Sequence, residues 1–135
     1  EGPIAHWLLV GDEAALPAIG RRVEELSAHE QATAVTAVPA VEDEQAFAAS
    51  APYQAHWVHR PMTQADDARA IVAVLEKLHI AERTFVWIGA EAHVAKAVQR
   101  YLVEQRGVPE KWIKAAGYWI KGQADSAVKD LQTVG

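Results

Sequence analysis

Short apolar stretches and helical patterns alternate along the whole chain, and this alternation constrains the fold more than any other feature of the sequence. A strand can lie parallel to the strand before it only after a crossover, so the alternation predicts a parallel sheet with helices on both faces. We therefore predict an α/β fold, a three-layer, doubly wound parallel sheet of about five strands. The expected strands are 7–10, 33–38, 54–59, 84–88 and 114–120, and apolar residues recur at helical spacing over 16–26, 71–78 and 91–106.

The chain has the size and composition of one domain. It has 135 residues, half of them hydrophobic, which is enough to bury a single core. Its net charge of −5 argues against nucleic acid as a partner, because phosphate binding favours a basic surface. The sequence has no cysteine and no apolar run near the roughly 20 residues that span a bilayer, and we expect no signal peptide. We expect a cytoplasmic protein without a membrane span.

Individual residues mark where the predicted helices begin and end. Pro17 suits the first turn of a helix, where its missing N–H group is not needed. Residues 63–66 have the pattern of a capping box in front of the second helix, and Gly107 is the expected C-cap of the third. The acidic segment 41–52 reads as a loop with a helical turn, and the tail from Gln123 as a short helix.

The first strand and the helix after it form a candidate anion site. The apolar strand at 7–10 leads through a turn at Gly11 into a helix, whose first N–H groups have no partner within the helix. Such groups can bind phosphate. Because only one glycine is present, the segment is not the G-x-G-x-x-G fingerprint, and an ordinary strand–turn–helix of an α/β protein also explains it.

A second glycine, followed closely by an acid, stands at the end of the fourth predicted strand. If the strand order is 3-2-1-4-5, the first and fourth strands are neighbours at the switch point, where such sheets bind ligands. We then expect a pocket between the two carboxyl ends. The alternative is that both glycines are ordinary turns and that the acids favour helix N-termini. The residues concerned are Gly11, Asp12, Glu13, Gly89, Ala90 and Glu91.

Other chemistries find no support in the sequence. His56 and His59 lie three apart in a predicted strand and point to opposite faces, so we expect no metal site. The P-loop and the G-x-S-x-G elbow are absent. What remains are backbone amides, basic groups and aromatic residues, which suit a cofactor that brings its own chemistry. Tyr118 and Trp119 face opposite ways, and one of them could stack on a planar ring, although core packing explains them equally well.

Five motifs, taken in order, closely resemble the C-terminal domain of the siderophore-interacting protein family. Members of this family are flavin-dependent ferric-siderophore reductases related to ferredoxin–NADP reductase. The resemblance covers nearly the whole chain and implies one NAD(P)H-binding domain over 1–135, with a ferredoxin–NADP reductase-like sheet of order 3-2-1-4-5. The motifs are 7–19, 57–60, 87–91, 100–102 with 106–108, and 117–122.

The resemblance also implies which residues bind the dinucleotide. Residues 11–16 would approach the phosphates, with Ala14 where the family usually has threonine and therefore without one hydroxyl contact. Arg60 would lie at the adenosine end, where a guanidinium favours a 2′-phosphate. Residues 89–91 would border the nicotinamide, and Tyr118 and Trp119 would lie near the flavin and nicotinamide rings. The implied cofactor-binding residues are Gly11, Asp12, Glu13, Ala14, Ala15, Leu16, Arg60, Gly89, Ala90, Glu91, Tyr118 and Trp119.

The family's N-terminal flavin-binding barrel has no counterpart in this sequence. In the intact enzyme, hydride would pass from NAD(P)H to FAD, and electrons would then reduce a ferric siderophore and release iron. Splitting a hydride into single electrons requires the flavin, so we expect no catalytic residue in this chain alone and no activity without a flavin-binding domain in cis or in trans. The alternative is a stand-alone, non-catalytic binding module of the same fold, with another ligand or a protein partner.

Overall fold

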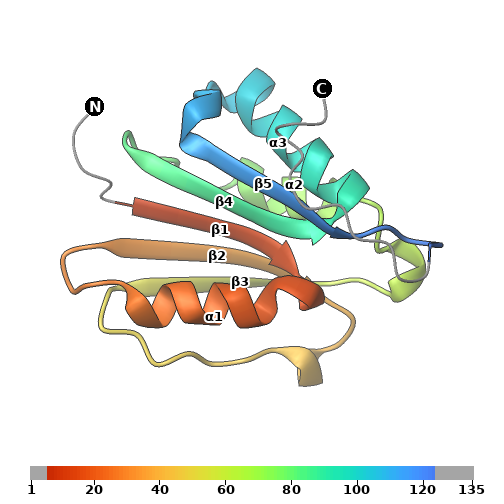
Figure 1. The fold of residues 1–135 in the computed structure, drawn as a ribbon, viewed down its shortest axis with the longest axis horizontal. Helices are drawn as coiled ribbons and strands as arrows, with labels where there is room; N and C mark the ends of the chain where they lie inside the picture. The colour runs from red at the N-terminus through yellow and green to blue at the C-terminus, as the bar shows by residue number, and fades with distance from the viewer. Residues whose placement is uncertain (1–5, 124–135) are drawn as a thin grey trace.

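The protein is a single parallel sheet between helices, as seen in a computed structural model that describes residues 6–123. All pairings in the five-stranded sheet are parallel, and the strand order is β3-β2-β1-β4-β5 (Figure 1). This confirms the predicted α/β fold and its strand order. The strands are β1 (His6–Asp12), β2 (Gln31–Val38), β3 (Tyr53–His59), β4 (Thr84–Glu91) and β5 (Ile113–Trp119).

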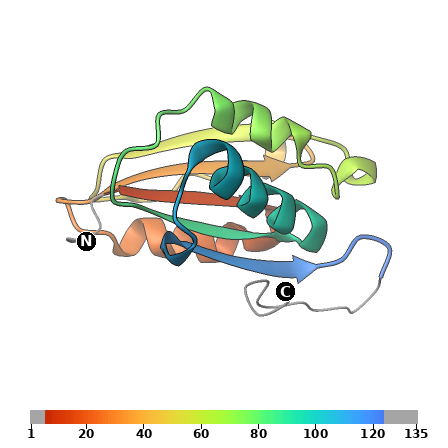
Figure 2. The same ribbon diagram turned by 90° about the horizontal axis from the view of Figure 1, so that it is seen from above.

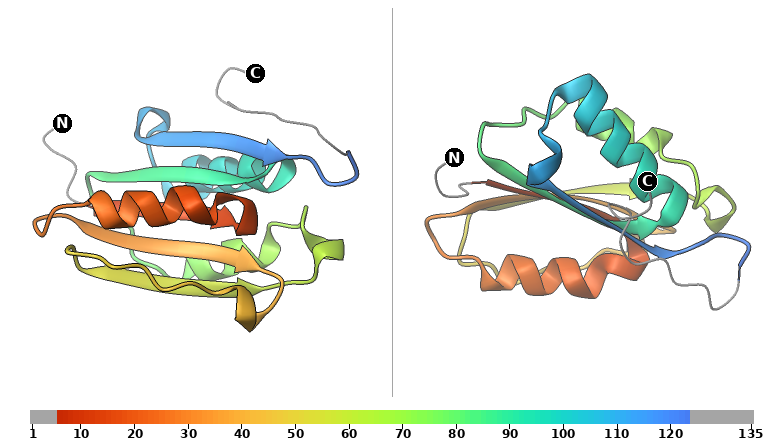
Figure 3. Two further views of the ribbon diagram at one scale, coloured as in Figure 1. Left: turned by 60° about the horizontal axis from the view of Figure 1, so that its bottom comes forward. Right: turned by 45° about the horizontal axis from the view of Figure 1, so that its top comes forward.

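Helices cover both faces of the sheet, which gives the three layers (Figure 2). Helix α1 (Leu16–Glu25) lies on one face, while α2 (Arg69–Glu76) and α3 (Ala92–Arg106) lie on the other (Figure 3). Successive residues of a strand point to opposite faces, so Leu9 packs under α1 whereas Leu8 and Val10 pack under α2 and α3. Each face therefore has its own buried apolar cluster, and the central strands are apolar on both sides.

Glycine is required at the centre of the sheet because two strands approach closely there. Strand β1 continues through Gly11, which pairs with Thr36 and Gly89, so Gly11 does not form the turn that the sequence predicted. A Cβ at this position would lie 2.6 Å from the backbone oxygen of Gly89, closer than real Cβ contacts come. The turn instead follows Asp12, as a short 3-10 helix (Glu13–Ala15) that leads into α1.

The helix ends confirm some of the sequence signals and correct one. Pro17 lies in the first turn of α1, and Gly107 ends α3 with a left-handed φ of 71°. The predicted capping box at 63–66 is wrong, because this segment overlaps a separate 3-10 turn (Met62–Gln64) and α2 begins later, at Arg69. Asp67 serves the helix start instead: its Oδ1 atom accepts the backbone N–H of Arg69 at 3.0 Å.

The remaining predictions concern segments outside the sheet. The segment 41–52 contains one 3-10 turn (Val41–Asp43), as the acidic pattern indicated. Gln123 bridges to Ile120, and the short helix expected beyond Gln123 lies outside the described residues. Strand β5 ends at Trp119, so the motif with the two adjacent aromatic residues stands at the carboxyl edge of the sheet.

Candidate functional site

The carboxyl ends of β1 and β4 meet at the switch point of the sheet, and one carboxylate joins them. Asp12, the last residue of β1, accepts the backbone N–H of Glu91 in β4 at 2.9 Å through Oδ2. The same oxygen accepts the indole Nε1–H of Trp119 in β5 at 3.1 Å. The other oxygen accepts the backbone N–H of Ala14 at 3.0 Å and thereby caps the 3-10 turn. Asp12 therefore connects β1, β4, β5 and the entrance of α1.

This carboxylate is deeply buried. Asp12 is 1% exposed, and burial followed by the charge of the neighbouring Glu13 raises the pKa of its carboxyl, against the lowering effect of its three donors. A buried polar group that is fully hydrogen-bonded holds its surroundings in one arrangement. We conclude that Asp12 fixes where the β4–α3 turn and the Trp119 indole lie relative to β1.

Glu91 plays the corresponding part at the end of β4. It is fully buried, and its Oε1 atom caps α3 by accepting the backbone N–H groups of His93 at 2.7 Å and Val94 at 3.1 Å. Its Oε2 atom accepts the backbone N–H of Lys121 at 3.0 Å and contacts Nδ1 of His93 at 2.8 Å. The first donors of this helix are thus satisfied within the chain rather than left for a ligand.

Arg60 reaches from the end of β3 to the middle of the same edge. Its Nη2 atom donates to Oε1 of Glu13 at 2.9 Å and lies 4.0 Å from Oδ2 of Asp12. Its side chain is only 7% exposed, so the guanidinium is a buried counter-charge for the two acids. Its Nη1 atom points to the sulfur of Met62 at 3.4 Å.

The residues implied as cofactor-binding are therefore brought together but differ sharply in accessibility. Gly11, Asp12, Ala15, Leu16, Arg60, Gly89, Ala90 and Glu91 are buried, whereas Glu13 and Trp119 are partly exposed and Ala14 and Tyr118 are exposed. The expectation that the two glycine–acid segments lie on adjacent strands is confirmed. A ligand at this edge would contact the turn after β1 and the aromatic pair at the end of β5.

The aromatic pair has a rigid support. Tyr118 packs edge-on against Trp87, with ring centroids 6.1 Å apart. The guanidinium of Arg22 lies over the Trp87 ring, 5.3 Å from its centroid. Gly89 leaves room for both rings, because a Cβ there would lie 2.6 Å from Trp87 and 3.1 Å from Tyr118. The exposed Tyr118 thus stands on a packed aromatic base at the carboxyl edge.

A hollow of about 350 Å³ adjoins this edge at the end of β3. The hollow is lined by Arg60, Gln64, Asp67, Arg69 and Ala70. Asp67 and Arg69, both of which line it, form an ion pair with Nη2 of Arg69 at 2.6 Å from Oδ2 of Asp67. The hydrogen bonds from the Arg69 side chain and backbone lower the pKa of Asp67 to about 2, so this carboxyl is ionised at neutral pH.

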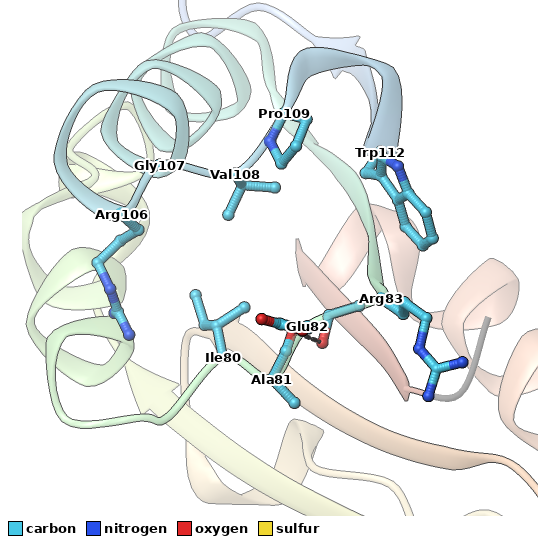
Figure 4. A pocket seen from close by; sticks show the side chains of 10 residues that line it. Ile80, Ala81, Glu82, Arg83, Arg106, Gly107, Val108, Pro109 and Trp112 are labelled. Atoms are coloured by element: carbon cyan, nitrogen blue, oxygen red, sulfur yellow. Dashed lines mark hydrogen bonds between the residues drawn. The ribbon is translucent and has the colours of Figure 1, made fainter. Parts of the chain in front are cut away.

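A second hollow of similar volume, about 350 Å³, lies at the opposite end of the sheet (Figure 4). Ile80 and Val108 line it, with Trp112 on one side (Figure 4). Arg106, also on its wall, donates from its guanidinium to the backbone oxygens of Leu75 and Leu78 at 2.7 Å and so ties α3 to the end of α2. This hollow is at the amino edge of the strands, away from the predicted site.

The structure also bears on metals and membranes. Over residues 6–123, no three His, Cys, Asp or Glu side chains are arranged so that they could hold a metal ion. Within the same range, no helix has the length and apolar character needed to cross a bilayer.

The sequence correctly indicated that the two glycine–acid segments lie on adjacent strands, but not the contacts between the residues there. Asp12 and Glu13 were recognised as acids at a helix entrance, whereas their partners Glu91 and Trp119 come from other strands and Arg60 follows β3. The hollow at the end of β3 was missed altogether. Its only sequence signal is an acid and a base two positions apart in front of an apolar helical pattern, which is common on protein surfaces.

Comparison with known proteins supports the resemblance. A model of the siderophore-interacting protein family matches residues 4–122. A Mycobacterium tuberculosis protein of uncharacterized function is 33% identical over 91% of this chain and 47% of its own length. The NADPH-dependent ferric-chelate reductase of Escherichia coli is 32% identical over 85% of this chain and 44% of its own. The chain thus spans about half the length of the relatives it matches.

Solved structures agree with the fold and the family. A siderophore utilization protein from T. fusca superposes with a TM-score of 0.78 at 31% identity, over 93% of this chain and 49% of that one. The siderophore-interacting protein of Aeromonas hydrophila gives a TM-score of 0.77 at 25% identity, over 92% of this chain and 49% of that one. With the family model matched over nearly all of its length, the chain belongs to the siderophore-interacting protein family.

Proposed function

We propose that this chain is the NAD(P)H-binding domain of a flavin-dependent ferric-siderophore reductase. The single observation that carries the proposal is the meeting of β1 and β4 at the switch point, held by Asp12 and bordered by the exposed Tyr118 and the partly exposed Trp119. Open α/β sheets bind dinucleotides at such a point. A relative that is named an NADPH-dependent ferric-chelate reductase supports the chemistry.

The residues at this edge fit a dinucleotide despite their negative charge. Three carboxylates there, from Asp12, Glu13 and Glu91, would repel phosphate if they were free. Each is already engaged: the first accepts three donors, the second pairs with Arg60, and the third caps α3. Held in this way, the acids stiffen the site, and the guanidinium of Arg60 offsets part of their negative charge.

Each part of the edge has a proposed task. Ala14, in the turn after β1, is exposed and has a small side chain, so phosphates would approach there. Tyr118 and Trp119 would contact the nicotinamide and orient it. Arg60, paired with Glu13, keeps the turn in place on the adenosine side. When bound, NAD(P)H would supply hydride to a flavin held by a separate domain, while this chain binds and orients the dinucleotide.

The rival proposal is a non-catalytic module of the same fold. One observation favours it: eight of the twelve residues implied as cofactor-binding are buried, and some of them are bonded to each other rather than open to a ligand. Such a module would keep the network for stability and use the edge for another ligand or for a protein. The two proposals differ in whether NAD(P)H binds.

Reconstitution with flavin tests the reductase proposal. We expect the purified chain to be colourless and to leave NADPH oxidation with a ferric siderophore at background. Addition of a flavin-binding barrel from a family member, fused or in trans, should then produce reductase activity. A Trp119→Ala variant should slow hydride transfer more than it weakens phosphate binding. Stoichiometric flavin on this chain, or ferric reductase activity from it alone, would contradict the proposal.

A further inference from the structure

Two guanidinium groups line the hollow at the end of β3, and only one of them is free to change partner. Arg60 is buried and holds Glu13, so moving it would leave an unpaired acid inside the protein. Arg69 has a side chain that is 92% exposed, and within residues 6–123 its ion pair is with the neighbouring Asp67. An exposed ion pair of this kind contributes little to stability and can be exchanged at little cost.

The guanidinium of Arg69 is held in a fork that suits a phosphate. Its Nε atom lies 3.0 Å from both carboxylate oxygens of Asp67, and Nη2 lies 2.6 Å from Oδ2. The backbone N–H of the same residue also bonds Oδ1 of Asp67. Carboxylate and phosphate present similar pairs of oxygens to arginine, so an acid that orients the fork in the free protein can be replaced by a phosphate.

The hollow stands where the far end of a dinucleotide would lie. In the strand order, β3 and β5 are the two edges and β1 is central. A dinucleotide whose nicotinamide is at Tyr118 and Trp119 in β5, and whose phosphates are near Ala14 after β1, would extend its adenosine ribose toward the end of β3. The hollow, at about 350 Å³, is within the size range of small-molecule sites.

We propose that Arg69 binds the 2′-phosphate of NADPH in this hollow, exchanging Asp67 for the phosphate, and that it selects NADPH over NADH. The inference rests on the proposed function, since it assumes a dinucleotide along the carboxyl edge. The resemblance implied that Arg60 binds the 2′-phosphate, but in the structure the guanidinium of Arg60 donates to Glu13. Arg60 also lines the hollow, but its charge is already paired with Glu13.

Calorimetry with two nucleotide fragments tests the proposal on the chain as it is. The ligands are adenosine 2′,5′-bisphosphate, which carries the extra phosphate, and adenosine 5′-monophosphate, which lacks it. The parent should bind the bisphosphate more tightly. Arg69→Gln should weaken the bisphosphate about ten-fold and leave the monophosphate unchanged, since only one charge-assisted contact is lost. Arg69→Lys keeps the charge but not the fork, so its affinity for the bisphosphate should lie between those of the parent and of Arg69→Gln.

Two further variants control for charge. Arg100→Gln removes another exposed arginine, on α3, and should leave both affinities unchanged. Asp67→Asn removes the competing acid and should tighten bisphosphate binding. If the parent binds both fragments equally, or if Arg69→Gln weakens the binding of both equally, Arg69 does not bind the 2′-phosphate. The proposal that the chain binds a nucleotide would remain in that case. If neither fragment binds, both this inference and the proposed function fail.

Discussion

Replacement of Asp12 by asparagine tests whether the buried carboxylate holds the site together. Asparagine keeps one acceptor oxygen but puts an NH₂ group where Oδ2 now accepts from Glu91 and Trp119. Each buried donor that loses its acceptor costs about 1–3 kcal/mol, so two lost partners predict about 2–6 kcal/mol. Removal of a buried charge returns part of this, and we expect a net loss of about 2–4 kcal/mol in the free energy of unfolding.

Urea denaturation at neutral pH measures this loss, and a matched variant isolates the role of burial. Asp43→Asn makes the same change at an exposed cap, where Oδ2 accepts the backbone N–H of Ala40 at 3.2 Å. We expect that variant to stay within about 0.5 kcal/mol of the parent, since asparagine also caps well. If Asp12→Asn were as stable as Asp43→Asn, the carboxylate would not be the connection between the strands that we describe.

Three further predictions follow from the site and its surroundings. Gly11→Ala puts a methyl group 2.6 Å from a backbone oxygen of β4 and should cost about 3 kcal/mol by urea denaturation, whereas Gly20→Ala, which meets only a movable phenyl ring, should cost less. Because the pKa of Asp67 is lowered to about 2, its pairing should stabilise the protein fully above the ordinary pKa of 3.8, and this stabilisation should be lost as the pH falls toward 2. An NMR titration of Asp67 should show this midpoint, and Arg69→Gln should raise it, since only the backbone N–H of residue 69 then remains as a donor. Ala14→Thr adds a hydroxyl at the exposed turn and should tighten NADPH binding about three-fold by calorimetry, and an unchanged affinity would remove that turn from the phosphate site.

The sequence was sufficient to predict the architecture because its signals are local and repeat. Apolar runs such as 84–88 and helical spacing such as 91–106 recur in alternation, and parallel strands joined by helices admit few topologies. The places where glycine meets an acid then mark the carboxyl edge. Gly107 and Pro17 were correctly read as helix ends because their backbone restrictions do not depend on distant partners.

The connections inside the site could not be predicted, because they join residues far apart in the chain. Asp12 bonds Glu91 and Trp119, which lie 79 and 107 positions away. The Arg60–Glu13 pair spans 47 positions. The capping-box error has a local cause: the pattern at 63–66 was plausible, but Asp67 competes for the role by bonding the backbone of Arg69 at the true start of α2.

The most direct test of the central claim is to observe which end of the sheet NADPH contacts. Trp119 lies at the carboxyl edge, where its indole N–H bonds Asp12, and Trp112 lines the hollow at the amino edge. We propose to record the indole Nε1–H resonances of ¹⁵N-labelled chain during an NADPH titration, with assignments from Trp119→Phe and Trp112→Phe. The account predicts a saturable shift of the Trp119 resonance while that of Trp112 stays in place. A shift confined to Trp112, or no shift of either resonance at saturating NADPH, would contradict a dinucleotide site at the carboxyl edge.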